Sequence, residues 1–492
     1  MEIGFDNNLY VQKQTEKIRE RIAQFSGKLY LEFGGKLFDD YHAARVLPGF
    51  HADGKIRLLQ AMKDQAEIIF AISAGDIEKT KIRADLGISY DMEVLRLIDD
   101  ITETGISVNS VVITQYTGQP AADAFAKKLT SRGVRNYIHR PIAGYPAAVE
   151  HICSDAGYGS NPYIETTKPL VVVTAPGPGS GKLATCLSQV YHEYRRGVMA
   201  GYAKFETFPI WNLPLKHPVN LAYEAATADL NDVNMIDPFH LEAYGKTTVN
   251  YNRDVEAFPI VQTILERITG NKEFYRSPTD MGVNMAGYAI FDDEVVRTAA
   301  CEEILRRYYK AACDCKQGKA SEASLHKIEN ILQQLGLQPT DRAVVAPALK
   351  RRDETHQPAA AIRLPDGRIV TGRASNLMSA CSATVLNSIK AIAGIQDITL
   401  IRPEVLEPIL RMKIDILGSR SSVLKVDDTL AGLAVTAADD PVAAKAMAAL
   451  PLLRDCDMHS SQMLHSGDEG TLRKLGLRLT MEPVYPSKDL YF

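Results

Sequence analysis

The sequence contains 492 residues, which is too long for one ordinary hydrophobic core, so we expect two or three domains. Hydrophobic residues make up 46% of the chain and charged residues 24%, as in ordinary soluble globular proteins. The 56 basic residues nearly balance the 60 acidic ones, and the resulting net charge of -4 gives no broad positive field for nucleic acid. We therefore expect no nucleic-acid partner.

The N-terminal segment lacks the features of an export signal. Residues 1–25 are charged and amphipathic, without the apolar core of about 7 to 15 residues that a secretory signal needs. No later apolar run reaches the roughly 18 residues of a membrane-spanning helix. The seven cysteines are odd in number and widely scattered, which indicates reduced thiols. These features predict a cytoplasmic protein without a membrane partner.

Short apolar runs alternate with helical stretches in the first part of the chain. The runs are rich in β-branched and aromatic residues and cover 28–33, 67–73, 108–114, 136–140 and 170–175. Such alternation is typical of parallel strands covered by helices. Residues 1–290 are therefore predicted to form a Rossmann-like, doubly wound α/β domain of the nucleotide-binding kind.

Two further parts follow. Residues 291–338 repeat apolar positions at helical spacing with a break at Gly318, and they predict a helical insert or subdomain. Residues 360–372 then alternate apolar and polar side chains around a Pro-Asp-Gly turn, which predicts a β-hairpin. With a helix in 376–394, a strand at 397–401 and a strand near 477–483, residues 339–492 are predicted to form a C-terminal α+β domain.

The segment VVVTAPGPGSGKLATCLSQ, residues 171–189, has a P-loop-like pattern in which an apolar strand, a glycine-rich turn and a helix follow one another. Such a turn binds phosphate because glycines let backbone N–H groups point inward, the helix N-terminus adds a positive field, and a lysine neutralises the anion. The predicted cofactor-binding residues are Gly177, Gly179, Ser180, Gly181 and Lys182.

Two positions depart from the standard magnesium-dependent loop. The pattern G-x-x-x-x-G-K-[ST] requires glycine at 176 and a hydroxyl at 183, where the sequence has Pro176 and Leu183. Thr185 lies two residues further along, which rotates it by roughly 200° to another face of the helix. We therefore expect a phosphate cradle whose magnesium, if one binds, is held elsewhere. The alternative is a structural turn with a solvated lysine.

Asp237 is a candidate magnesium ligand, since carboxylates at strand ends commonly hold this ion. A turn or helix cap before Pro238 is the stronger alternative for it.

The loop after the first apolar run contains Gly34, Gly35, Lys36, Asp39, Asp40, His42 and Arg45. In an open α/β sheet this loop and the loop at 175–182 both follow the carboxyl ends of strands, so they are expected to face one pocket. There Lys36 or Arg45 would bind an acidic substrate, and Asp39 or Asp40 would act as a base or a metal ligand. An exposed turn and a solvated helix face are the alternative.

The segment 205–230 is rich in proline and has no clean periodicity, which is typical of lids and binding loops. It contains the single tryptophan, Trp211, together with Lys216, His217 and Glu224. Arg253, further along, is a candidate for holding an acidic substrate. Hydrogen-bonded structural roles are the alternative for each of these residues.

Metal signatures are poor. HEYRR after Tyr191 lacks the second histidine of HExxH, and no C-x-x-C pair has zinc spacing. Cys456, His459 and His465 lie close in sequence without a clear fourth ligand. We therefore do not expect zinc.

The phrases LEFGGKLFDDYHAARVLPGF, VVVTAPGPGSGKLATCLSQ and SPTDMGVNMAGY resemble the uncharacterised bacterial family called domain of unknown function 1846. The resemblance covers essentially the whole chain. It implies a nucleotide-binding-like α/β domain, a helical insert and a C-terminal α/β subdomain, and it implies no established activity. Some members carry the label of an ATP-dependent zinc protease, but HExxH is absent here.

The sequence thus favours a protein that binds a phosphorylated or acidic small molecule, with ATP as one candidate. As an enzyme it would catalyse phosphoryl transfer or an ATP-dependent ligation, with Lys182 neutralising the phosphate, Asp237 or Asp40 holding magnesium, and Arg45 or Arg253 steadying the substrate. The alternative is a non-catalytic, metabolite-binding regulatory protein that assembles as a homo-oligomer.

Overall fold

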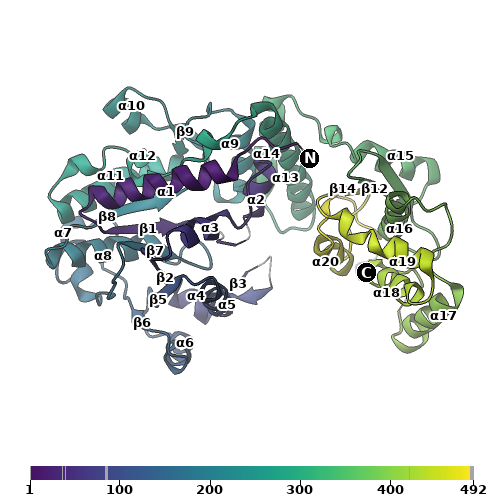
Figure 1. The fold of residues 1–492 in the computed structure, drawn as a ribbon, viewed down its shortest axis with the longest axis horizontal. Helices are drawn as coiled ribbons and strands as arrows, with labels where there is room; N and C mark the ends of the chain where they lie inside the picture. Colours follow the sequence, from purple (N-terminus) through teal and green to yellow (C-terminus); the bar gives the residue numbers. More distant parts are fainter. Residues whose placement is uncertain (1, 36, 39, 84–86, 420, 488–492) are drawn as a thin grey trace. The chain divides into compact units, whose positions relative to one another are not determined.

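The computed structural model describes residues 2–35, 37–38, 40–83, 87–419 and 421–487, and these form two compact units. The sheet unit consists of Glu2–Glu224 and Asp232–Ala300, and the C-terminal unit consists of Ala225–Asn231 and the described residues from Cys301 onwards (Figure 1). The helix α13 (Asp293–Lys316) begins in the first unit and continues in the second. The division of the chain into three parts at 290/291 and 338/339 stays a prediction.

A main sheet of parallel strands lies at the centre of the sheet unit. In sheet order the described strands are β11 (Gly282–Val283), β8 (Gly201–Phe205), β1 (Leu29–Phe33), β7 (Leu170–Thr174), β2 (Ala66–Ser73), β5 (Ser107–Thr114) and β6 (Asn136–Ile138). The mixed α/β class and the five predicted strands are therefore confirmed. The sequence does not predict β8 or β11, because Lys204 interrupts the apolar pattern of β8 and β11 has only two residues.

Helices cover both faces of this sheet. Tyr30 of β1 donates a hydrogen bond to Glu193 of α8 at 2.7 Å, so even-numbered residues of β1 face α8. Phe33 faces the other way and stacks on Phe205, over which Lys55 of α3 lies. Before residue 293 the helices are α1 (Asn7–Gln24), α2 (Tyr41–Val46), α3 (Gly54–Ala61), α4 (Ala74–Glu78), α5 (Tyr90–Glu103), α6 (Pro120–Ser131), α7 (Val149–Ile152), α8 (Lys182–Arg195), α9 (Pro218–Ala226), α10 (Pro238–Tyr244), α11 (Asn252–Thr269) and α12 (Pro278–Met281).

The order in which successive strands are added to the sheet reverses at β7. β7 lies between β1 and β2, although both of those strands precede it in sequence, and the next strand, β8, lies on the far side of β1. Ligands of open α/β sheets bind at such points, beyond the carboxyl ends of the strands. Two antiparallel pairs, β3 (Ile82–Arg83) with β4 (Ile88–Ser89) and β9 (Asn234–Ile236) with β10 (Val249–Tyr251), lie outside the main sheet.

The C-terminal unit combines helices with a mixed sheet. Its described strands, in sheet order, are β13 (Ile369–Arg373), β12 (Ala359–Arg363), β14 (Asp457–Ser460) and β15 (Arg478–Met481). Its helices after α13 are α14 (Glu322–Leu335), α15 (Val345–Thr355), α16 (Ala380–Ala393), α17 (Pro403–Arg411), α18 (Val426–Ala437), α19 (Pro441–Ala448) and α20 (Ser466–Lys474). The predicted hairpin is confirmed, because β12 and β13 pair antiparallel and Gly367 in their turn is left-handed, with φ at 86°.

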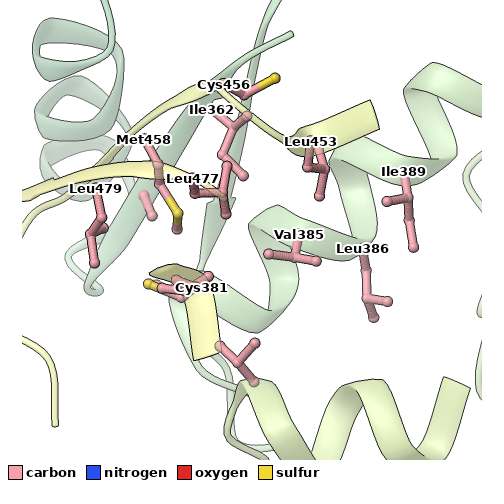
Figure 2. Close-up of a cluster of buried hydrophobic side chains, with 14 of the residues drawn as sticks. Ile362, Cys381, Val385, Leu386, Ile389, Leu453, Cys456, Met458, Leu477 and Leu479 are labelled. Carbon is pink, nitrogen blue, oxygen red and sulfur yellow. The ribbon is translucent and has the colours of Figure 1, made fainter. Parts of the chain in front are cut away.

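One predicted strand of this unit is wrong. The described residues 397–401 form no strand. Leu400 and Ile401 are apolar because they are buried in the core of the unit, not because they pair in a sheet. Figure 2 shows part of that core, where side chains of the sheet such as Ile362 and Met458 gather with side chains of α16 such as Val385.

Arg342 links the helical and sheet parts of the C-terminal unit. Its side chain is 2% exposed, and its guanidinium donates to the carboxylates of Glu302 in α13 and Asp457 in β14, both at 2.9 Å. It also donates to the Thr480 hydroxyl and to the backbone carbonyl of Arg478. Removing one partner of a buried ion pair is costly, because the charges that remain are uncompensated.

We therefore expect Arg342→Met to lower the free energy of unfolding of the C-terminal unit by roughly 3 kcal/mol, measured by urea denaturation. The matched control is Arg411→Met, since the Arg411 side chain is 72% exposed and its one partner among the described residues is the similarly exposed Glu407. That change should cost less than about 0.5 kcal/mol. Equal effects of the two substitutions would contradict the role given to Arg342.

Candidate functional site

The loop between β7 and α8 is shaped by its glycines. A Cβ at Gly177 would lie 2.3 Å from the Tyr90 hydroxyl, so the backbone there packs directly against that ring. Gly179 and Gly181 are left-handed, with φ at 76° and 83°, a region that residues with a side chain rarely adopt. Gly181 is also the N-cap of α8, where it supplies no capping side chain. The loop therefore needs glycine at these three positions.

The carbonyl groups of this loop point towards β5. The Thr114 hydroxyl donates to the carbonyl of Ser180 at 2.8 Å, and the Gln115 amide donates to the carbonyl of Gly179 at 3.4 Å. In a planar trans peptide the C=O of one residue and the N–H of the next point in opposite directions. The N–H groups of Ser180 and Gly181 therefore point away from β5, to the side where the sheet places β1 and β8.

Those N–H groups have no acceptor in the part of the chain that the structure describes. None of the hydrogen bonds found there uses the N–H of Gly179, Ser180, Gly181 or Lys182 as its donor. Ser180 is fully buried, and buried N–H groups without a partner are rare in proteins. The Lys182 ammonium likewise pairs with no described carboxylate. This arrangement can bind a tetrahedral anion.

Three residues around the loop, Pro176, Leu183 and Thr185, offer no magnesium ligand to its interior, as the sequence predicts. Thr185 donates to the Gly181 carbonyl at 2.9 Å and is buried, so its hydroxyl does not face the loop interior. Pro176 has no N–H to offer, and Leu183 offers no hydroxyl to a metal. The first turn of α8 thus lacks the usual magnesium ligand.

The loop after β1 lies beside this site, because β1 and β7 are neighbours. Asp40 is the N-cap of α2, and its carboxylate pairs with the buried ammonium of Lys55 at 3.0 Å. Burial alone would raise the pKa of Asp40, but the charge of Lys55 holds it below its usual value. Arg45 lies in the last turn of α2. Lys36 and Asp39 lie outside the described residues.

Asp237 and Arg253 belong to elements other than the strand and helix that flank the glycine loop. Asp237 is the fully buried N-cap of α10, and it accepts hydrogen bonds from His240, Asn250 and Thr279. It follows β9, which is outside the main sheet. Asp237 thus caps the helix that starts at Pro238, which is the alternative that the sequence favoured.

Arg253 is the second residue of α11, and its exposed side chain pairs with Asp232 at 3.2 Å.

A second polar group, absent from the sequence-based prediction, lies where β1 and β8 end. Lys204 of β8 pairs with Asp254 of α11 at 2.6 Å and with Glu206 at 2.8 Å. Glu32 of β1 lies opposite Lys204 in the strand register and accepts a hydrogen bond from Tyr202 at 2.9 Å. We call Glu32, Lys204, Glu206 and Asp254 the carboxylate cluster. Its only signal in the sequence is a charged residue inside an otherwise apolar strand.

The charges of the carboxylate cluster are unevenly balanced. Burial raises the pKa of Glu206 to about 7, because the attraction of Lys204 does not offset burial and the repulsion of Asp254. Burial alone would lower the pKa of Lys204, but Asp254, Glu206 and Glu32 raise it above its usual value. The carboxyl of Glu206 can therefore exchange a proton near neutral pH.

The carboxylate cluster and the glycine loop lie on the same face of the sheet. Burial raises the pKa of the Cys186 thiol in α8; Glu32 raises it further, and Lys182 opposes that rise. Cys186 therefore lies near both charges.

Other features of the described chain point to no competing site. Two shallow cavities, of about 350 Å³ between α1 and α3 and about 400 Å³ beside β13, contain none of the predicted site residues. No three His, Cys, Asp or Glu side chains among the described residues are grouped as metal ligands. None of the helices in those residues has both the length and the apolar character needed to cross a membrane.

The fold is that of a mixed α/β protein with a parallel central sheet. Residues 3–336 match the model of the domain of unknown function DUF1846, N-terminal, and residues 340–491 match its C-terminal counterpart. The chain belongs to this family, as its motifs indicate. A UPF0371 protein of Clostridium tetani is 53% identical over 501 residues, covering all of both chains. A UPF0371 protein of Streptococcus thermophilus and one of Streptococcus pneumoniae are each 56% identical over 489 residues, covering 99% of both chains.

The ionisation of Glu206 can be followed through Trp211, the single tryptophan of the sequence. The Trp211 ring and a carboxylate oxygen of Glu206 both lie within 3.2 Å of the position that a Cβ at Gly282 would take. We expect the tryptophan emission of the native protein to change with a midpoint near pH 7, the pKa of Glu206. Glu206→Gln should abolish this transition.

The control is Glu256→Gln, since Glu256 is exposed on α11 and should leave the transition unchanged. The pKa of Glu206 is raised from 4.5, so the native state binds its proton more tightly than the unfolded state does. The free energy of unfolding should therefore fall as the pH rises from 4.5 to about 7, and less so in Glu206→Gln. A transition that persists in Glu206→Gln would assign the titration to another group.

Proposed function

We propose that the chain binds the phosphate group of a small molecule or nucleotide at Gly177–Lys182, in a Rossmann-like domain with a P-loop-like turn. The loop N–H groups support this site, because they have no acceptor among the described residues and the neighbouring Lys182 ammonium pairs with none of the described carboxylates. A phosphate dianion would accept hydrogen bonds from these donors and neutralise the lysine.

The position of the loop supports the same proposal. It follows the central strand β7, at the point where the order of the strands changes direction. The loop after β1, with Asp40 and Arg45, borders it. A substrate whose phosphate lies in the loop would extend over this edge of the sheet.

In its enzymatic form the proposal is an ATP-dependent phosphoryl transfer or ligation. Lys182 and the loop N–H groups would neutralise the phosphate, Asp40 would hold a metal ion, and Arg45 or Arg253 would steady an acidic second substrate. Asp237 is the weakest candidate for magnesium, since both of its carboxylate oxygens already accept hydrogen bonds.

The alternative is a non-catalytic metabolite-binding or regulatory protein that forms homo-oligomers. Leu183 favours this alternative, because the helix lacks the hydroxyl that holds magnesium in nucleotide-hydrolysing enzymes. Cytoplasmic location belongs to both forms of the proposal.

Inorganic phosphate and ATP, titrated into the protein by calorimetry, test the binding directly. We expect Lys182→Ala to weaken the affinity for phosphate at least about tenfold, because a charge-assisted contact is lost. The control is Lys127→Ala, since Lys127 is an exposed lysine of α6. Failure of the wild type to bind either compound would rule out the proposal.

The role of Leu183 is tested by a matched pair of substitutions. Leu183→Thr introduces a hydroxyl in the first turn of α8, whereas Leu183→Val has nearly the same shape without it. Magnesium should leave the ATP affinity of the wild type and of Leu183→Val unchanged, and should raise that of Leu183→Thr by about tenfold. A wild type whose ATP binding depends strongly on magnesium would show that another residue holds the ion.

A further inference from the structure

The two carboxylate oxygens of Glu206 have different neighbours: one contacts Lys204, and the other lies beside Gly282 and Trp211. Its Oε1 forms an ion pair with the ammonium of Lys204 at 2.8 Å. Its Oε2 would lie 3.2 Å from a Cβ at Gly282, and the Trp211 ring would lie 2.5 Å from the same point. Glycine at 282 therefore allows the indole edge and the carboxylate oxygen to approach the same small region.

Two hydrogen-bonding groups at this region have no partner among the residues that the structure describes. The Trp211 N–H and the Tyr251 hydroxyl are both buried and unpaired there. Tyr251 is 4% exposed, and the charges of Glu206 and Asp254 contribute to raising its pKa, although burial is the largest cause. Tyr251 is the N-cap of α11, three residues before Asp254 of the carboxylate cluster. Buried polar groups without a hydrogen-bonding partner are costly. Several of them close together therefore indicate that a ligand supplies the missing partner.

The chemistry of these groups specifies what would satisfy them. Glu206 Oε2 accepts a hydrogen bond, the Trp211 N–H donates one, and the Tyr251 hydroxyl can do either. A hydroxyl group both donates and accepts, so it can bond with all three at once, whereas an ammonium group can only donate. We propose that Glu206, Trp211 and Tyr251 form a subsite for a hydroxyl group of the ligand whose phosphate lies in the glycine loop.

The spacing of the strands sets the size of this ligand. The glycine loop follows β7 and Glu206 follows β8, with only β1 between them, so the two positions are separated by about 10 Å. The N–H groups of the loop point to the side of β1 and β8. The ligand class is therefore a phosphorylated sugar or a nucleotide that carries a hydroxyl about 10 Å or less from its phosphate. This inference rests on the proposed function.

Calorimetry with inorganic phosphate, glucose 6-phosphate and ADP tests the subsite. We expect at least one of the two organic phosphates to bind the wild type at least about tenfold more tightly than inorganic phosphate. In Glu206→Gln the amide oxygen would accept from Lys204 and the amide N–H would face the ligand, so a donor replaces the acceptor. That variant should lose the tenfold gain and keep the affinity for inorganic phosphate.

Trp211 provides a second readout. The tighter organic phosphate should change the tryptophan emission of the wild type, whereas inorganic phosphate should not. Trp211→Phe, which removes the indole N–H, should reduce the same calorimetric gain, and the exposed Glu256→Gln should not.

The outcomes separate this inference from the proposed function. If inorganic phosphate and both organic phosphates fail to bind the wild type, the proposed function is wrong and the subsite is lost with it. If phosphate binds but neither organic phosphate binds more tightly, or Glu206→Gln keeps the gain, the subsite alone is wrong.

Discussion

The geometry of the candidate site depends on two side chains that hold the glycine loop, one from the last residue of β5 and one from the residue directly after it. Thr114 and Gln115 bind the carbonyls of Ser180 and Gly179, and peptide planarity then turns the following N–H groups to the opposite side. Gly179 and Gly181 make this orientation accessible because both are left-handed. The loop is thus held in place by protein contacts on one side, and on the other its N–H donors have no acceptor among the described residues.

The carboxylate cluster adds a second constraint at the same edge. Charged residues are costly to bury, and among the described residues Lys204 is the one cation that forms ion pairs with Glu206 and Asp254. Arg342 in the C-terminal unit shows the contrasting case, because its guanidinium has carboxylate, hydroxyl and carbonyl partners on several elements. A fully partnered charge serves stability, whereas the raised pKa of Glu206 and the unpaired groups beside it fit a binding role better.

The sequence predicted those elements whose residues follow a simple local pattern. The apolar runs of β1, β2, β5, β6 and β7 and the Pro-Asp-Gly turn before β13 are read correctly for this reason. The strand predicted at 397–401 is wrong, because Leu400 and Ile401 are apolar for packing in the core of the C-terminal unit and not for pairing in a sheet. The carboxylate cluster could not be found, since Glu32, Lys204 and Asp254 meet through strand register and a helix far along the chain. Asp237 shows a different difficulty: the sequence located this residue, but an aspartate that caps a helix and one that binds a metal have the same sequence pattern.

Everything proposed for this site requires the N–H groups of the glycine loop to bind a tetrahedral anion. The most direct measurement is a crystal structure of the wild-type protein soaked in tungstate, a phosphate-like anion that is located by its anomalous scattering. We expect an anomalous peak at the loop, with oxygens of the anion about 2.9 Å from the backbone nitrogens of Ser180, Gly181 and Lys182. An empty loop whose N–H groups bind acceptors within the protein would contradict it.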